Sequence, residues 1–94
     1  MAGLRPAIPP DVAVVIRHLP PDIKRAVKSA IRALSANPNA GEPLLRELGG
    51  WWKYRVRRYR IVYEIRQKEA VLRIIAIGLR RTIYEELADL SRQK

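Results

Sequence analysis

The spacing of apolar residues changes once along this chain, and that change limits the folds open to it. Between residues 21 and 36 the apolar residues recur at helical spacing, which predicts one buried face of an α-helix. From residue 51 onward they alternate with charged residues, which predicts β-strands. Because the helical part precedes the strands and does not alternate with them, we expect an α+β domain.

Two Pro-Pro-Asp triplets, at residues 9–11 and 20–22, mark the starts of two helices. The first helix is expected near residues 10–18, and the second ends before the loop at 37–41, so the two form an antiparallel hairpin. A short edge strand at residues 3–8 is an option. The expected buried stripe of the second helix is Ile23, Ala26, Val27, Ala30, Ile31 and Leu34.

Two alternating strands flank Arg57-Arg58, and a third, apolar on nearly both faces, covers residues 70–78. Ile83, Leu87 and Leu90 predict a short C-terminal helix. The expected fold is therefore one α+β domain over residues 1–94. Its helical hairpin packs on a twisted, mainly antiparallel sheet of three to four strands.

If Arg57-Arg58 is a two-residue hairpin loop, it determines which residues of the first two strands face each other. One sheet face is then apolar and the other carries directly opposed cations. Such opposition is unfavourable for stability, so a bound anion explains it better. Arg-Arg lacks the Gly, Asn or Asp that such loops favour, so a longer loop with shifted pairing is an alternative. The expected pairs are Val56 with Tyr59, Arg55 with Arg60, Tyr54 with Ile61, Lys53 with Val62, and Trp52 with Tyr63.

The positive charge is concentrated in the strand region. The chain has net charge +10, and residues 51–81 hold ten Lys or Arg against only Glu64 and Glu69. This predicts a polyanion partner, which would be nucleic acid, an RNA-rich assembly or an acidic protein segment; a merely solvated basic surface is the alternative. With no Cys and a single His18, expected at a helix end, we expect no metal and no cofactor. Neither a signal peptide nor a membrane-length apolar run is visible, which predicts a soluble cytoplasmic protein.

Several short motifs follow one another between residues 44 and 84. They are Leu48, Gly50, Trp51, Trp52, Lys53, Arg55, Tyr59-Arg60-Ile61-Val62-Tyr63 and Gly78-Leu79-Arg80-Arg81-Thr82-Ile83-Tyr84. In this order they resemble the RelE/ParE superfamily of type II toxin–antitoxin toxins, over essentially the whole chain. The resemblance implies a helical hairpin on a twisted antiparallel sheet. In RelE-like members it also implies a concave basic face that enters the ribosomal A site and cleaves mRNA.

The resemblance also implies site residues. Many members have a His where this chain has Leu79, which argues against a His-based acid–base step, and many have a Gly-Asp-like turn at Arg57-Arg58. Glu42, in "GEPL", resembles a Glu that acts as a base in the YoeB-like branch. The residues that correspond to the family's catalytic positions are Lys53, Arg55, Arg60, Arg80 and Tyr84.

Metal-independent RNA cleavage uses the 2′-hydroxyl as nucleophile and needs a base, charge stabilisation on the phosphate and a proton for the leaving oxygen. Arg60 and Arg80 suit the phosphate but cannot act as bases. Lys53 is the candidate base because nearby cations disfavour its charged form. Tyr84 is either near the leaving group or a core aromatic. The expected RNA contacts are Trp51, Arg57, Arg58 and Arg81, with Trp51 partly exposed and Trp52 inside.

Three functions are compatible with these residues. The first is a ribosome-dependent mRNA endonuclease that inhibits translation. The second is a ParE-like inhibitor of DNA gyrase, and the third is a nucleic-acid-binding module of the same fold without activity. The resemblance implies a cognate antitoxin, which we expect to be acidic and to form a hetero-oligomer with the toxin; the ribosome and mRNA, or alternatively DNA gyrase, are the other expected partners.

Overall fold

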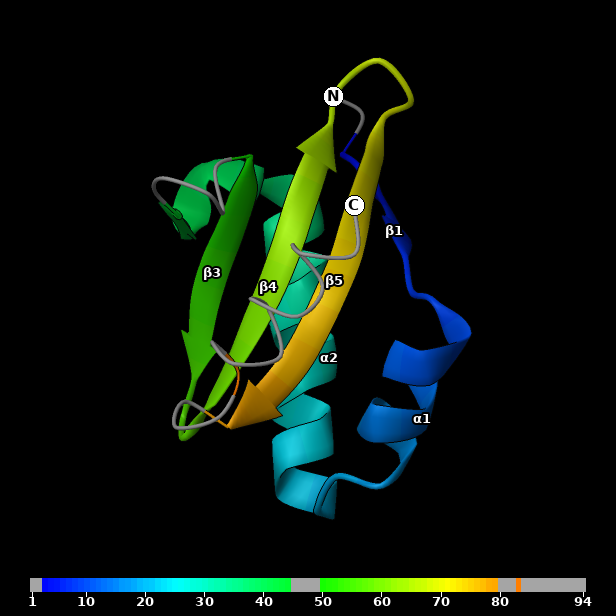
Figure 1. Cartoon of the computed structure of the whole chain (residues 1–94), viewed down its shortest axis with the longest axis vertical. Coiled ribbons are helices and arrows are strands. Elements are labelled where there is room, and N and C mark those ends of the chain that lie inside the picture. Colours follow the sequence, from blue (N-terminus) through cyan, green and yellow to red (C-terminus); the bar gives the residue numbers. More distant parts are fainter. Residues whose placement is uncertain (1–2, 45–49, 80–82, 84–94) are drawn as a thin grey trace.

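In the part of the chain that the structure describes, helices α1 and α2 lie on one side of a five-stranded sheet (Figure 1). The structure is a computed structural model, and it describes residues 3–44, 50–79 and 83. The strand order is β1-β5-β4-β3-β2, in which only β1 and β5 pair in parallel. The elements are β1 (Arg5–Ala7), α1 (Pro10–Arg17), α2 (Pro21–Ala36), the 3-10 turn η1 (Pro38–Ala40), β2 (Glu42–Pro43), β3 (Trp51–Val56), β4 (Tyr59–Arg66) and β5 (Val71–Leu79).

This architecture confirms the predicted α+β fold and both helix starts. The sheet has five strands where three to four were expected. The additional strand β2 is only two residues long and contains Pro43, so no alternation could reveal it. The expected C-terminal helix lies outside the described residues except for Ile83, which is fully buried.

The β3–β4 hairpin has all five of the expected pairs, from Val56 with Tyr59 to Trp52 with Tyr63. The two-residue loop therefore forms without Gly, Asn or Asp, and Arg57 adopts a left-handed conformation with φ of 56°. Two contacts hold it there. Arg55 donates a hydrogen bond from Nε to the Arg57 carbonyl at 3.2 Å, and Arg57 Nη1 lies 3.8 Å from Asp22 Oδ2.

The main core lies between the helices and the sheet. The predicted stripe of α2 faces it, with Val27 and Leu34 completely buried. From the sheet, the expected apolar face of the β3–β4 hairpin packs against these helix residues, and the fully buried ring of Tyr63 is part of it. The buried members are Val12, Ile16, Leu19, Val27, Ala30, Ile31, Leu34, Val56, Ile61, Tyr63, Leu72, Ile74 and Ile77.

A β-bulge lets β5 contribute to both faces of the sheet. Val62 pairs with Ala76 and the next residue, Tyr63, pairs with Ile74, so Ile75 is an extra residue on β5. Ile74 and Ile77 consequently join the main core, while Ile75 and Ala76 belong to a second apolar cluster. The bulge explains why this strand is apolar at nearly every position.

Tyr63 also ties the loop after α2 to the sheet. Its hydroxyl donates a hydrogen bond to the Pro38 carbonyl at 2.7 Å and accepts one from the Gly41 N–H at 3.1 Å. A side chain at position 41 would collide with this hydroxyl, so glycine is required there. Burial raises the pKa of Tyr63 above its ordinary value of 10.0.

We expect Tyr63→Phe to lower the free energy of unfolding by about 1–3 kcal/mol, because the Gly41 N–H loses its acceptor and the Pro38 carbonyl its donor. The raised pKa means that the stabilisation by Tyr63 is complete below pH 10 and is lost as the pH rises through the higher folded-state value. Urea unfolding from pH 7 to 11 should therefore show the two proteins converging at the alkaline end. Tyr59→Phe, which removes the same atom from a half-buried ring, should change stability by less than about 0.5 kcal/mol. A difference between wild type and Tyr63→Phe that grows above pH 10 would contradict the assignment.

Candidate nucleic-acid interface

The sheet surface that faces away from the helices carries three of the predicted site residues. We call it the basic face and define it by Lys53, Arg55 and Arg60. Register partners in an antiparallel pair share a face, so the pairing of Arg55 with Arg60 and of Lys53 with Val62 places all three side chains together. Arg55 is exposed, and Lys53 and Arg60 are half-buried. The prediction that these cations share one face is confirmed.

Glu42 also lies on the basic face. It pairs with Lys53 between β2 and β3, so its exposed carboxylate and the Lys53 ammonium come from neighbouring positions. The two candidate bases thus come from paired positions on neighbouring strands. Tyr84 lies outside the described residues, as do Arg80 and Arg81.

An apolar cluster occupies the centre of the basic face and includes Trp51. The expectation that Trp51 is partly exposed is wrong, because this ring is only 4% exposed and packs with Leu44 and Ile83. Trp52 packs against the main core but stays half-buried, with its ring 6.2 Å from that of Tyr63. The alternation pattern could not reveal Leu44 and Ile83 as a cover for this side of the sheet. A ring buried to this extent offers no open face to a base, so nothing here supports base stacking by Trp51.

Arg57 and Arg58 lie at the tip of the β3–β4 hairpin, where both are exposed. Their position extends the positive charge beyond Arg55 and Arg60 at the end of the sheet. The 3.8 Å ion pair between Arg57 and Asp22 is also exposed, so it competes weakly with any external anion.

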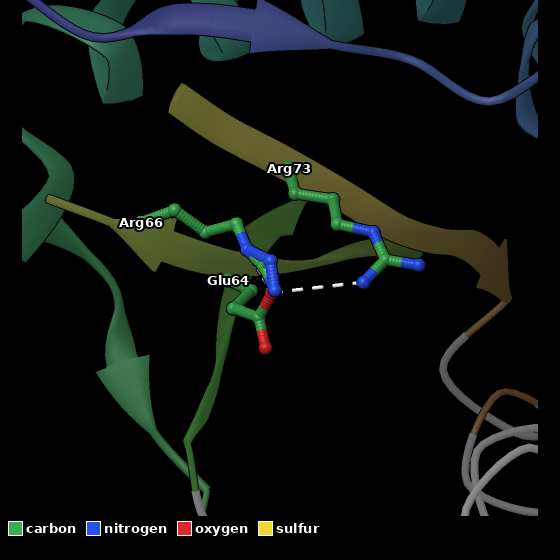
Figure 2. A network of polar contacts seen from close by, with 3 residues as sticks. All are labelled: Glu64, Arg66 and Arg73. Carbon is green, nitrogen blue, oxygen red and sulfur yellow. Dashed lines mark ion pairs between the residues drawn. The ribbon is translucent and has the colours of Figure 1, made fainter. Parts of the chain in front are cut away.

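A second group of charged residues on this side was missed by the sequence analysis. Figure 2 shows Glu64 of β4 between Arg66 and Arg73. Glu64 Oε1 lies 3.2 Å from Arg66 Nε and 3.7 Å from Arg73 Nη1. The alternation along β4 could have placed Glu64 and Arg66 on the same face as Arg60. The partner on β5 depends on the bulge, which the sequence does not specify.

The helical hairpin carries a groove of about 580 Å³ with an apolar floor and a basic rim. Arg17 comes from α1, and the rim cations of α2 recur every four residues, which aligns them along one side of the helix. Val14 and Val15 of α1 are also exposed. We call the apolar lining residues the floor and the basic ones the rim; the floor consists of Ile8, Ala13, Ile16 and Ile31, and the rim of Arg17, Lys24, Lys28 and Arg32.

A helical hairpin on one side of a sheet and cations on the other are features of a RelE/ParE-like toxin fold, and solved structures of such toxins superpose on this chain. The toxin–antitoxin complex RelBE2 of Mycobacterium tuberculosis matches with a TM-score of 0.76 and 30% identity, over 85% of this chain and 94% of that chain. A mutant of the Escherichia coli toxin RelE in the free state has a TM-score of 0.76 at 20% identity, over 99% and 97%. The YoeB/ParE toxin from Agrobacterium tumefaciens has a TM-score of 0.69 at 20% identity, over 81% and 98%.

The sequence matches a family model over residues 11–84, that of the ParE toxin of the type II toxin-antitoxin system, parDE. The chain therefore belongs to the ParE toxin family of type II toxin–antitoxin systems, within the RelE/ParE superfamily that its motifs predicted. No curated protein matches the sequence. In the part of the chain that the structure describes, no helix is long and apolar enough to cross a membrane.

Proposed function

We propose that this toxin cleaves mRNA on the ribosome. The observation that carries the proposal is the placement of Lys53, Arg55 and Arg60 on one sheet face, with Arg55 directly opposite Arg60. Like charges in register destabilise a hairpin, and a bound phosphate offsets that repulsion. The half-buried position of Arg60 limits the motion of its guanidinium, which favours a fixed contact with a phosphate oxygen.

The chemistry needs no metal when the RNA 2′-hydroxyl attacks the adjacent phosphate and displaces the 5′-oxygen of the next nucleotide. Arg60 and Arg55 stabilise the negative charge that develops on the phosphate. Lys53, or the neighbouring carboxylate of Glu42, takes the proton from the 2′-hydroxyl. Tyr84 supplies the proton for the leaving oxygen, and Arg80 donates a hydrogen bond near it; the superfamily resemblance assigns both residues to catalytic positions.

Inhibition of DNA gyrase is the second candidate function. The matching family is that of the ParE toxin, and Leu79 stands where many RNA-cleaving relatives have a His. In this alternative the basic face contacts a protein–DNA complex and no bond in RNA is broken.

Induction of the chain alone in growing cells separates the two functions. Cleavage on the ribosome should produce new mRNA 5′ ends inside translated codons within minutes, and the ends should disappear from a message whose start codon is removed. Sequencing of RNA ends measures this, and plasmid supercoiling is measured in the same cells. Loss of negative supercoiling without new RNA ends would overturn the proposal and support gyrase inhibition.

A cognate acidic antitoxin is the proposed partner. Several of the similar solved structures are toxin–antitoxin complexes, which supports such a partner for this chain. The groove on the helical hairpin suits an amphipathic acidic helix, because its apolar floor takes the apolar face and its four rim cations take the carboxylates. A segment that folds on binding can continue from there to the sheet edge and the basic face.

A further inference from the structure

We propose that Arg66 and Arg73, held in place by Glu64, form a second phosphate-contacting cluster on the same side of the sheet. The inference rests on the proposed function, since it assigns these arginines to the RNA strand that lies on the basic face. The ligand is the phosphodiester backbone of single-stranded RNA, outside the nucleotides whose bond is cleaved.

The side chains of Arg66 and Arg73 both approach Glu64 (Figure 2). Both guanidinium groups share one carboxylate oxygen of Glu64, at 3.2 Å and 3.7 Å. Glu64 is the least exposed of the three at 23%, whereas Arg66 and Arg73 are 42% and 51% exposed. A guanidinium has five N–H donors, so each arginine retains donors for an external anion. One carboxylate thus orients two arginines and leaves a net positive charge facing the solvent.

The cluster lies on the same side of the sheet as the basic face, further along β4 and β5. Side chains alternate along a strand, so Glu64 and Arg66 share the face of Arg60 on β4. Arg73 pairs with Glu64, and Arg5 of β1 reaches the same face through its pairing with Val71. Glu64 lies four positions after Arg60, which is about 14 Å along the strand. That span is too long for one phosphate and suits consecutive nucleotides of an extended strand.

The cluster of Glu64, Arg66 and Arg73 has two other possible roles, which are to stabilise the fold or to bind an acidic protein segment. The arginine ends of both ion pairs are exposed to solvent, which limits what the pairs add to stability, so stability alone is a weak explanation for two arginines on one carboxylate. An acidic amphipathic segment would find apolar contacts in the groove between the helices, whereas this cluster consists of charged side chains on the sheet. A strand of phosphates needs only the cations. RNA is therefore the occupant that the cluster fits.

The test measures affinity for fluorescent 2′-O-methyl RNA, which cannot be cleaved, by anisotropy with the 94-residue chain. We expect Arg66→Gln/Arg73→Gln to weaken binding of an oligomer of about 12 nucleotides at least tenfold, and to lower the slope of log affinity against log salt by about 1.4. Binding of a trinucleotide, which the basic face alone can cover, should change less than about twofold. Arg25→Glu removes the same net charge from the exposed side of α2 and is the matched control.

Glu64→Gln separates RNA binding from a structural role. Gln keeps an oxygen that accepts hydrogen bonds from both guanidinium groups but removes the negative charge that competes with phosphate, so the affinity for the longer RNA should stay equal or rise, even if the melting temperature falls. If Glu64→Gln and the double arginine variant lose affinity in proportion to their melting temperatures, the cluster is structural and the proposal is wrong.

Comparison with a variant of the basic face distinguishes failure of the second cluster from failure of the proposed function. If Lys53→Gln/Arg60→Gln weakens RNA binding but Arg66→Gln/Arg73→Gln does no more than Arg25→Glu, only the second cluster is refuted. If neither double variant exceeds the control, RNA contact by the whole face is refuted. Loss of affinity for the purified antitoxin instead of RNA would assign the cluster to the protein partner and overturn the inference.

Discussion

Expression of the wild-type chain without a partner should arrest growth, and replacing Arg60 with alanine should abolish that arrest. Loss of one guanidinium removes a charge-assisted contact to the phosphate in the transition state, and we expect cleavage to slow by about 10²–10³-fold. Arg60 stands opposite Arg55, so the substitution also relieves a like-charge contact and should not unfold the hairpin. Colony counts on inducing medium, together with mRNA end mapping, measure the effect.

Arg25→Ala is the matched control, since it removes the same side chain from the exposed surface of α2. It should leave toxicity unchanged. Circular dichroism and melting curves must show that Arg60→Ala is folded and as abundant as the control. A folded Arg60→Ala protein that arrests growth as strongly as wild type would remove Arg60, and with it the proposed chemistry, from the mechanism.

Association with the proposed acidic antitoxin should slow by about 10- to 10³-fold between low and high salt, while dissociation changes little. The groove rim and the basic face both attract carboxylates over long distances, and salt screens this attraction. The apolar floor of the groove makes the short-range contacts that determine how long the complex lasts. Stopped-flow association and surface-based dissociation, measured with the cognate partner over a range of salt concentrations, test this directly.

Charge reversal locates the steering residues. Lys24→Glu/Lys28→Glu on the groove rim should reduce the association rate at low salt more than Arg25→Glu/Lys68→Glu, which makes the same change in net charge at exposed positions outside the groove lining. An association rate that is indifferent to salt, or equal effects of the two double variants, would exclude the groove as the place of first contact.

The sequence predicted the β3–β4 hairpin to the residue because two constraints coincided there. A two-residue loop leaves one register, and alternation of aromatic and basic residues assigns each face. Arginine is an unfavourable residue for the left-handed conformation that such a loop requires. The structure shows that Arg57 adopts this conformation, and that its carbonyl accepts a hydrogen bond from Arg55. The helix bounds were equally accessible, because prolines mark both starts.

Features that depend on contacts between distant segments could not be predicted. The bulge at Ile75 adds one residue to β5, and no local pattern marks it. The pairing of Glu64 with Arg73 cannot be predicted from the sequence unless the position of the bulge is known. Trp51 was misjudged for the same reason, since its burial depends on Leu44 and Ile83, which reach it from other segments.

The two edges of the sheet have a consequence for how the molecule behaves once it is separated from its partner. Edge strands β1 and β2 have three and two residues, and each contains a proline, Pro6 and Pro43, which lacks a backbone donor. Edges this short offer little template for another copy to add a strand, and a net charge of +10 makes copies repel each other. The short edges of the described sheet and the net charge therefore favour separate molecules over aggregates, which leaves the basic face uncovered by other copies of the chain.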